Sequence, residues 1–326
     1  MMLDFSNQIA IGIDIGGTNT KYGIVNHRGE ILEKGELKTE GYSSVEEYIE
    51  AVYTTLKPIV SSVSNQYQLK GIGIGAPNGN YYTGTIDYAP NLEWKGRIPL
   101  VQMVTEKFGV RCILTNDANA AAVGEMMYGA ARGMRDFIMI TLGTGVGSGI
   151  VANGQLIYGH DGFAGELGHT IIRPGGRKHW STTIDGSLEA YCSATGIVLT
   201  AIELLEKFEG ESALKNYKPE DITSKVVYEC AQKGDPLAKE IYRFTGQILG
   251  ESLANFIMFS SPEAIILFGG VIKAGDYILA PTKEHMEKNL LPIFQDKVKL
   301  IFSELKEADA AILGASALVW ELKESQ

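Results

Sequence analysis

Residues 9–24 constrain the fold most strongly, because an apolar run, a glycine turn and a second short run follow one another there. Residues 9–15 and 21–25 predict a β-hairpin, with Asp14 at the end of its first strand. The turn offers small donors: the amides of Gly16 and Gly17 and the side chains of Thr18, Asn19 and Thr20. Such a turn can bind an anion, and a neighbouring carboxylate can hold Mg²⁺ against a polyphosphate. An ordinary hairpin with Asp14 in its turn is the alternative interpretation of this stretch alone.

A second stretch, residues 137–151, repeats the order of strand, glycine turn and strand. Thr141 stands in it where Asp14 stands in the first. The repetition indicates equivalent positions in two related domains. Two facing glycine-lined hairpins would hold a triphosphate from both sides. The lysine-containing P-loop pattern is absent, so this would be a different kind of phosphate site.

Strands and helices alternate in both halves of the chain, which predicts α/β domains with helix-covered sheets. Alternating glycines in residues 69–75 predict a strand that other backbone approaches closely. The G-x-G-x-x-A match there is followed by turn residues, whereas a dinucleotide-binding motif must open a helix. Further strands are expected at 31–37, 112–115, 264–268 and 298–302, helices at 45–59, 118–128, 187–208, 236–259 and 308–322, and a long loop at 80–99.

Composition narrows the class of protein. The chain has 326 residues, of which 45% are hydrophobic, enough for two domains. A formal net charge of −10 argues against non-specific binding to nucleic acid or to an anionic membrane. Three widely spaced cysteines suggest no disulfide framework and fit a reducing cytoplasm. We see no signal peptide and no apolar run of membrane-spanning length, so we expect a cytoplasmic protein.

Several short motifs occur together, and in an order that is itself informative. They are Asp14-Ile-Gly-Gly-Thr-Asn-Thr-Lys, Asn116-Asp117-Ala-Asn, Thr141-Leu-Gly-Thr-Gly-Val-Gly, Gly165-Glu-Leu-Gly-His169 and Leu188-Glu189. This combination resembles the ROK (repressor, open reading frame, kinase) family of the hexokinase/actin-like superfamily, from residue 9 to about residue 320. The resemblance implies two actin-like (ribonuclease H-like) α/β domains with an interdomain cleft that closes over MgATP and a sugar. It places residues 1–128, joined by the C-terminal helix 308–326, in one domain and residues 129–307 in the other.

The resemblance also implies roles for individual residues. Asp117 would be the catalytic base that takes the proton of the sugar 6-hydroxyl, and it can cap a helix at the same time. The implied sugar ligands are Asn91, Asn116, Asp117, Glu166, His169 and Glu189, with a weaker match at Gly79. The implied nucleotide segments are Asp14, Gly16, Gly17, Thr18, Asn19 and Lys21, then Thr141, Gly143, Thr144 and Gly145, with Gly269 and Gly270 near the adenosine. Asp14 is the candidate ligand of the nucleotide's Mg²⁺.

We therefore expect an ATP-dependent hexose kinase, a glucokinase in the first place, and a homodimer as is common in the family. An N-acetylglucosamine or N-acetylmannosamine kinase is the alternative, because these sugars differ from glucose at C2. A sugar-responsive repressor would need an N-terminal helix-turn-helix module, for which the hairpin at residue 9 leaves no room. A non-catalytic sugar-binding relative would not need both phosphate segments and Asp117.

One family feature is missing from the sequence. Most ROK proteins hold a structural zinc through the Gly-His histidine and three cysteines just before the Leu-Glu pair. Here Ser187 stands where the last cysteine would be, and no cysteine lies between Cys112 and Cys192. His169, His179 and Asp185 could supply three ligands, but hydroxyls replace thiolates poorly. We expect no zinc, with the loop held by packing of Trp180 and Ile184 and by hydrogen bonds.

Overall fold

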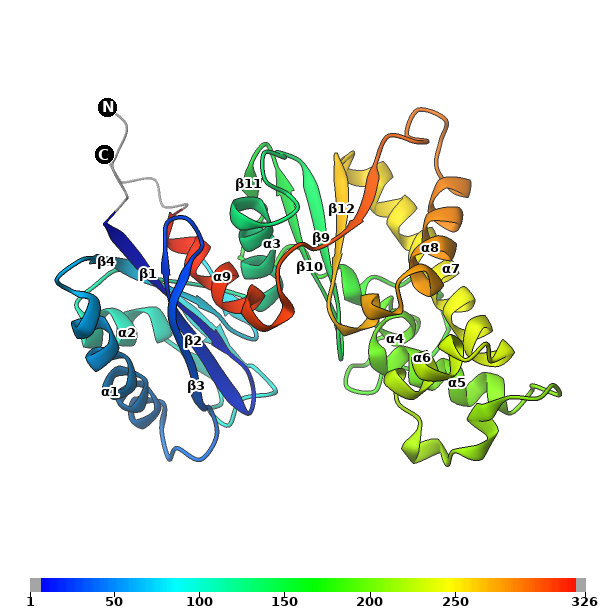
Figure 1. Cartoon of the computed structure of the whole chain (residues 1–326), viewed down its shortest axis with the longest axis horizontal. Helices are drawn as coiled ribbons and strands as arrows, with labels where there is room; N and C mark the ends of the chain where they lie inside the picture. Colours follow the sequence, from blue (N-terminus) through cyan, green and yellow to red (C-terminus); the bar gives the residue numbers. More distant parts are fainter. Residues whose placement is uncertain (1–6, 321–326) are drawn as a thin grey trace.

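The computed structural model describes residues 7–320 and contains two five-stranded sheets side by side (Figure 1). The first has the order β3-β2-β1-β4-β8 and the second the order β11-β10-β9-β12-β13. The strands of the first sheet are β1 (Gln8–Ile15), β2 (Asn19–Asn26), β3 (Ile31–Lys38), β4 (Gln68–Gly75) and β8 (Cys112–Thr115). Those of the second are β9 (Phe137–Leu142), β10 (Val146–Ala152), β11 (Gln155–Leu156), β12 (Ala264–Phe268) and β13 (Lys299–Phe302).

The two sheets share one topology. In each, the first strand is central, pairs antiparallel with the second and parallel with the fourth. Asp14 pairs with Lys21 across the first hairpin, and Thr141 pairs with Gly147 across the second. Each is the last but one residue of its strand. The predicted hairpins and their equivalence are confirmed.

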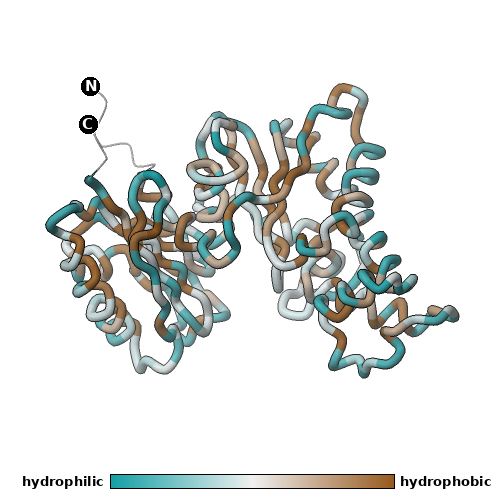
Figure 2. Tube along the Cα trace, in the orientation of Figure 1, coloured by the Kyte–Doolittle hydropathy of each residue, from teal (hydrophilic) through white to brown (hydrophobic). Residues whose placement is uncertain are grey.

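Helices cover the outer faces of both sheets, and each sheet packs with its helices around its own apolar core. The hydrophobic segments run through the central strands, with hydrophilic stretches on the outer helices and loops (Figure 2). In the part of the chain that is described, no helix is both long and apolar enough to cross a bilayer. The helices are α1 (Val45–Val63), α2 (Leu100–Phe108), α3 (Asp117–Tyr128), α4 (Glu189–Cys192), α5 (Ala194–Leu205), α6 (Ser224–Gln232), α7 (Pro236–Ser260), α8 (Asp276–Lys288) and α9 (Glu307–Trp320).

Helix α9 returns from the second sheet to lie on the first. Its backbone runs directly over the central strands, so that a Cβ atom on Gly12 or Gly73 would overlap the carbonyl oxygen of Ile312 or Ala315. The close backbone approach expected at β4 is therefore confirmed, and the element that makes it is α9. The expected helix 308–322 corresponds to α9, which is described as far as Trp320. Residues 321 and 322 lie outside the described range.

Helix α3 makes the opposite crossing, from the first sheet to the second. Ala118 and Ala122 pack on Gly147 and Gly149 of β10, where added Cβ atoms would lie 2.9 and 2.7 Å from the alanine Cβ atoms. The two crossing helices also touch each other: a Cβ atom on Gly124 would lie 2.8 Å from the Cα atom of Gly314. Small residues thus bring α3 and α9 together between the two sheets.

Three expectations were wrong in detail. Residues 80–99 are not a plain loop, since β5 (Gly79–Asn80), β6 (Thr85–Asp87) and β7 (Arg97–Ile98) form a small sheet there. The helix expected over 187–208 is divided into α4 and α5 at Ser193, whose extended backbone lets its side chain cap Gly196 N. Helices α2, α6 and α8 were not expected at all, although α2 ends at Gly109, whose left-handed backbone is a common helix terminator.

Gly73→Ala tests the packing of α9 on the first sheet. The added methyl group would meet backbone, which cannot turn aside as a side chain can, so we expect the free energy of unfolding to fall by about 3 kcal/mol. Gly270→Ala is the matched control, because nothing lies within 4 Å of its Cβ position. Urea unfolding of both variants measures the difference. Equal stability of the two variants would contradict this packing.

Candidate active site

The first hairpin presents Asp14 at the sheet edge where β1 and β4 end. A Cβ atom on Gly17 would lie 2.8 Å from the carbonyl oxygen of Asn91, so only glycine fits between the turn and the loop that follows β6. Gly17, Thr18 and Asn91 line one open, largely polar pocket together with Glu40, Glu93 and Lys95. The structure thus brings the predicted sugar ligand Asn91 to the first phosphate segment.

Asp14 is a half-buried carboxylate without a full counter-charge. The pKa of Asp14 is raised to about 6: burial raises it most, the negative charge of Asp117 adds to this, and Lys21 across the hairpin lowers it. A carboxylate in this state gains from a nearby cation. The Asp14 carboxylate and the backbone amides of the turn therefore fit a magnesium ion bound with a polyphosphate.

Asp117 lies at the start of α3, directly after β8. Asn116 is the N-cap, with its Oδ1 accepting from Asn119 N at 2.7 Å, and Asp117 is the first helical residue. The expectation that Asp117 itself caps the helix is corrected: its Oδ1 accepts from its neighbour Ala118 N at 2.8 Å. The side chain is exposed.

The second hairpin contributes its glycine turn from the other sheet. Gly269 follows β12 with a φ of +108°, and a Cβ atom there would lie 2.5 Å from Leu142 O at the end of β9. The predicted adenosine segment therefore adjoins the second phosphate segment. Gly143 and Gly270 have open space at their Cβ positions, and Thr144 is exposed, so the turn is accessible from outside.

Glu166 directly precedes the short 3₁₀ segment Leu167–His169 that follows β11, and His169 ends it. His169 Nε2 is 4.0 Å from Glu166 Oε2. Burial raises the pKa of Glu166; His169 lowers it, while the charges of Asp117 and Glu189 raise it. Three predicted sugar ligands and the predicted base are therefore electrostatic neighbours, although they come from both halves of the chain.

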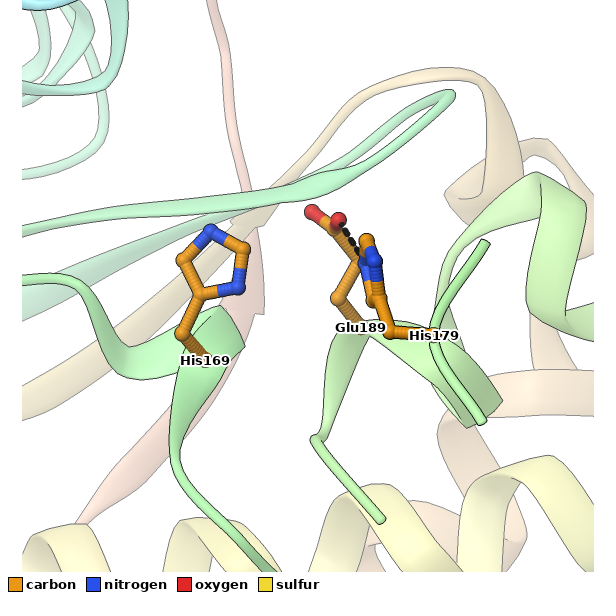
Figure 3. A group of neighbouring side chains, drawn as sticks. All are labelled: His169, His179 and Glu189. Atoms are coloured by element: carbon orange, nitrogen blue, oxygen red, sulfur yellow. Dashed lines mark hydrogen bonds and ion pairs between the residues drawn. The ribbon is translucent and has the colours of Figure 1, made fainter. Parts of the chain in front are cut away.

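Glu189 is held at both of its carboxylate oxygens. Oε2 accepts from Val146 N at 2.7 Å, and Oε1 is 2.6 Å from His179 Nε2. Figure 3 shows the imidazoles of His169 and His179 around this carboxylate. The three side chains offer ligand atoms within 4.8 Å of one another. Asp185, expected as a possible third ligand, is exposed and is not part of this group.

Gly79 lies away from solvent on β5. A Cβ atom there would be 2.5 Å from Thr115 O, one residue before Asn116. Gly79 therefore supports the loop that carries Asn116 and Asp117.

Comparison with known proteins agrees with this arrangement. The model of the ROK family matches residues 10–321. A glucokinase of Halalkalibacterium halodurans is 36% identical over 98% of this chain and 97% of its own length, and one of Thermotoga maritima is 33% identical over 95% and 97%. This chain belongs to the ROK family. A ROK glucokinase of Streptomyces griseus, solved with glucose and AMPPNP, superposes with a TM-score of 0.76 at 30% identity, covering 95% of this chain and 98% of that one. The expected family and the actin-like fold class are confirmed.

Two features of this ROK site were missed by sequence reasoning. His179 was considered only as a zinc ligand, whereas it is bonded to Glu189. The amide of Val146 was assigned no partner, whereas it joins the second glycine turn to the same carboxylate. The two contacts span ten and 43 residues of sequence, and neither has a periodic signal. The one hint was the position of His179 in the loop that replaces the cysteine motif.

Asp14→Asn tests whether the negative charge of Asp14 at the first glycine turn destabilises the fold. A raised pKa stabilises the folded state below the unfolded value of 3.8, and this contribution is lost as pH rises through about 6. Asn is always neutral, so at pH 8 without magnesium we expect it to increase the free energy of unfolding by about 1–3 kcal/mol. The gain should vanish near pH 4. Unfolding curves at both pH values measure it.

The exposed Asp161 provides the control for this comparison. Asp161→Asn should change stability by less than about 0.5 kcal/mol at either pH. A loss of stability in Asp14→Asn at pH 8 would contradict the assignment of a strained carboxylate.

Proposed function

We propose that this protein is an ATP-dependent hexose kinase that converts glucose and ATP to glucose 6-phosphate and ADP. One observation carries the proposal: Asp117 acts electrostatically on both Asp14 in the phosphate turn and Glu166 in the predicted sugar site. A base for phosphoryl transfer must stand between these two groups, because it meets the acceptor hydroxyl where the γ-phosphorus arrives. The similarity to glucokinases from several bacteria supports glucose as the acceptor.

The residues act in sequence on this view. Asn91, Asn116, Glu166, His169 and Glu189 bind the sugar hydroxyls through groups that accept or donate hydrogen bonds. The amides of both glycine turns bind the phosphates, and Asp14 holds Mg²⁺ of the nucleotide directly or through water. Asp117 accepts the proton of the sugar 6-hydroxyl while the hydroxyl oxygen bonds to the γ-phosphorus. The bond between the γ-phosphorus and the leaving ADP oxygen breaks in the same step. Asp117 then releases this proton to solvent as the product departs.

We also infer the arrangement around this chemistry. Residues 1–128 with the C-terminal helix form one domain and residues 129–307 the other, and the backbone contacts of α9 with β1 and β4 support the return of that helix. The chain acts as a cytoplasmic homodimer without nucleic acid or membrane. Three buried free thiols, Cys112, Cys192 and Cys230, suit a reducing compartment.

An ADP-release assay across glucose, mannose, N-acetylglucosamine and N-acetylmannosamine tests the function. We expect the highest kcat/KM with glucose. Turnover confined to an N-acetylated sugar would favour the alternative acceptor class. No turnover with any of them would favour a non-catalytic sugar-binding protein.

Asp117→Asn tests the base in the same assay. The variant keeps the shape of the side chain but loses the proton acceptor, so we expect kcat to fall roughly 10²–10⁴-fold. Glucose affinity, measured by calorimetry, should change little and so shows that the site is intact. A kcat near that of the wild type would exclude Asp117 as the base.

We propose further that the loop around residues 173–187 holds no structural zinc. The described residues place one carboxylate and two imidazoles together, and Glu189 is already bonded to Val146 N. Cys192 is buried elsewhere, with its Sγ directed to Thr245 O. Trp180 and Ile184 were expected to hold this loop by packing. Ile184 is half-buried, but Trp180 is 44% exposed and stacks on His179.

Metal analysis of the purified protein tests the absence of zinc. We expect far less than one zinc per chain, and no loss of folding or activity with a chelator when Mg²⁺ is in excess. About one zinc per chain, lost together with activity in His169→Ala, would overturn the proposal.

A further inference from the structure

His179 lies beside Glu189 and has no exposed side-chain surface. Its Nδ1 lies 3.1 Å from the backbone nitrogens of both Ser181 and Thr182, and both amides donate to it. An atom that accepts hydrogen bonds from two N–H groups carries no proton of its own. The loop therefore selects the imidazole tautomer with its proton on Nε2.

That proton points at Glu189. Nε2 is 2.6 Å from Glu189 Oε1, a short bond as expected for a donor to a carboxylate. The other oxygen of Glu189 accepts from Val146 N, and a Cβ atom on Gly145 would overlap it. Both oxygens of Glu189 are thus fixed, one by the loop around residues 173–187 and one by the second glycine turn.

The same geometry argues against a metal at the His169, His179 and Glu189 group. A histidine binds a metal through a nitrogen lone pair. In His179 the Nδ1 lone pair faces two backbone amides, and Nε2 carries the proton given to Glu189. Only His169 and Glu189 then remain, which is too few protein ligands for a zinc site.

We propose that His179 is a positioning residue for sugar binding: its Nε2–H orients the carboxylate of Glu189, and the Ser181 and Thr182 amides orient His179. The inference rests on the proposed function, in which Glu189 binds the sugar. The hydrogen bond holds Glu189 ready before the sugar arrives, so its loss should weaken sugar binding more than the chemical step.

Two substitutions of similar size separate the hydrogen bond from packing. His179→Gln keeps an N–H within reach of Glu189, whereas His179→Leu removes it. We expect His179→Leu to raise KM for glucose about tenfold, the effect of losing one hydrogen bond to a charged group, with kcat and KM for ATP within about threefold. His179→Gln should keep KM for glucose within about threefold of the wild type. His160→Leu, at an exposed histidine outside the site, is the control for loss of an imidazole.

A measurement on the wild type does not depend on variant folding. Nitrogen-15 NMR of histidine-labelled protein distinguishes a ring protonated at Nε2 from one protonated at Nδ1 or bound to metal, and His179→Gln assigns the signal. We expect protonation at Nε2, unchanged by one equivalent of zinc. Protonation at Nδ1, a zinc-bound ring, or equal KM values in the Gln and Leu variants would overturn the proposal.

Failure of the proposed function would look different. A wild type that turns over none of the tested sugars removes the kinase, and the positioning role of His179 is then decided by the glucose affinity of the Gln and Leu variants in calorimetry. A wild type that is active, with Gln and Leu variants that behave alike, removes only the positioning role of His179.

Discussion

The meeting of α3 and α9 is the contact on which the rest of the structure depends. Each helix leaves one sheet and packs on the other, and they touch at Gly124 and Gly314. Backbones can approach this closely only where no side chain intervenes. The crossing therefore explains a set of glycines and alanines in α3, α9, β1, β4 and β10 as one packing requirement. It also carries the N-terminus of α3, with Asp117, to the place between the two sheets.

That position gathers negative charge. Asp14, Asp117, Glu166 and Glu189 come from four separate segments. Burial raises the pKa of Asp14 and of Glu166 most, and the charge of Asp117 raises both further. Such an arrangement lowers the stability of the unliganded protein. It suits a site whose ligands are a magnesium nucleotide and a polyhydroxyl sugar, because both supply the positive or hydrogen-bonding partners that the carboxylates lack.

Glu189 connects two parts of this site that the sequence treats as independent. The second glycine turn reaches it through the Val146 amide, and the loop without cysteines reaches it through His179. One carboxylate therefore links the second glycine turn to the loop around residues 173–187. The loop is organised around a histidine held by backbone amides, a device that needs neither thiolates nor a metal ion.

The sequence by itself determined the parts with local signals. Apolar runs that meet glycine turns predicted both hairpins, and glycine alternation predicted a close approach at β4. The ordered motifs identified the family and the candidate residues. Three-dimensional packing alone decided which backbone approaches β4, how 80–99 folds into a small sheet, and where the chain breaks at Ser193. It alone also paired Glu189 with His179 and Val146. These contacts join residues far apart in sequence or depend on the direction of one N–H group, and neither periodicity nor motif spacing encodes such directions.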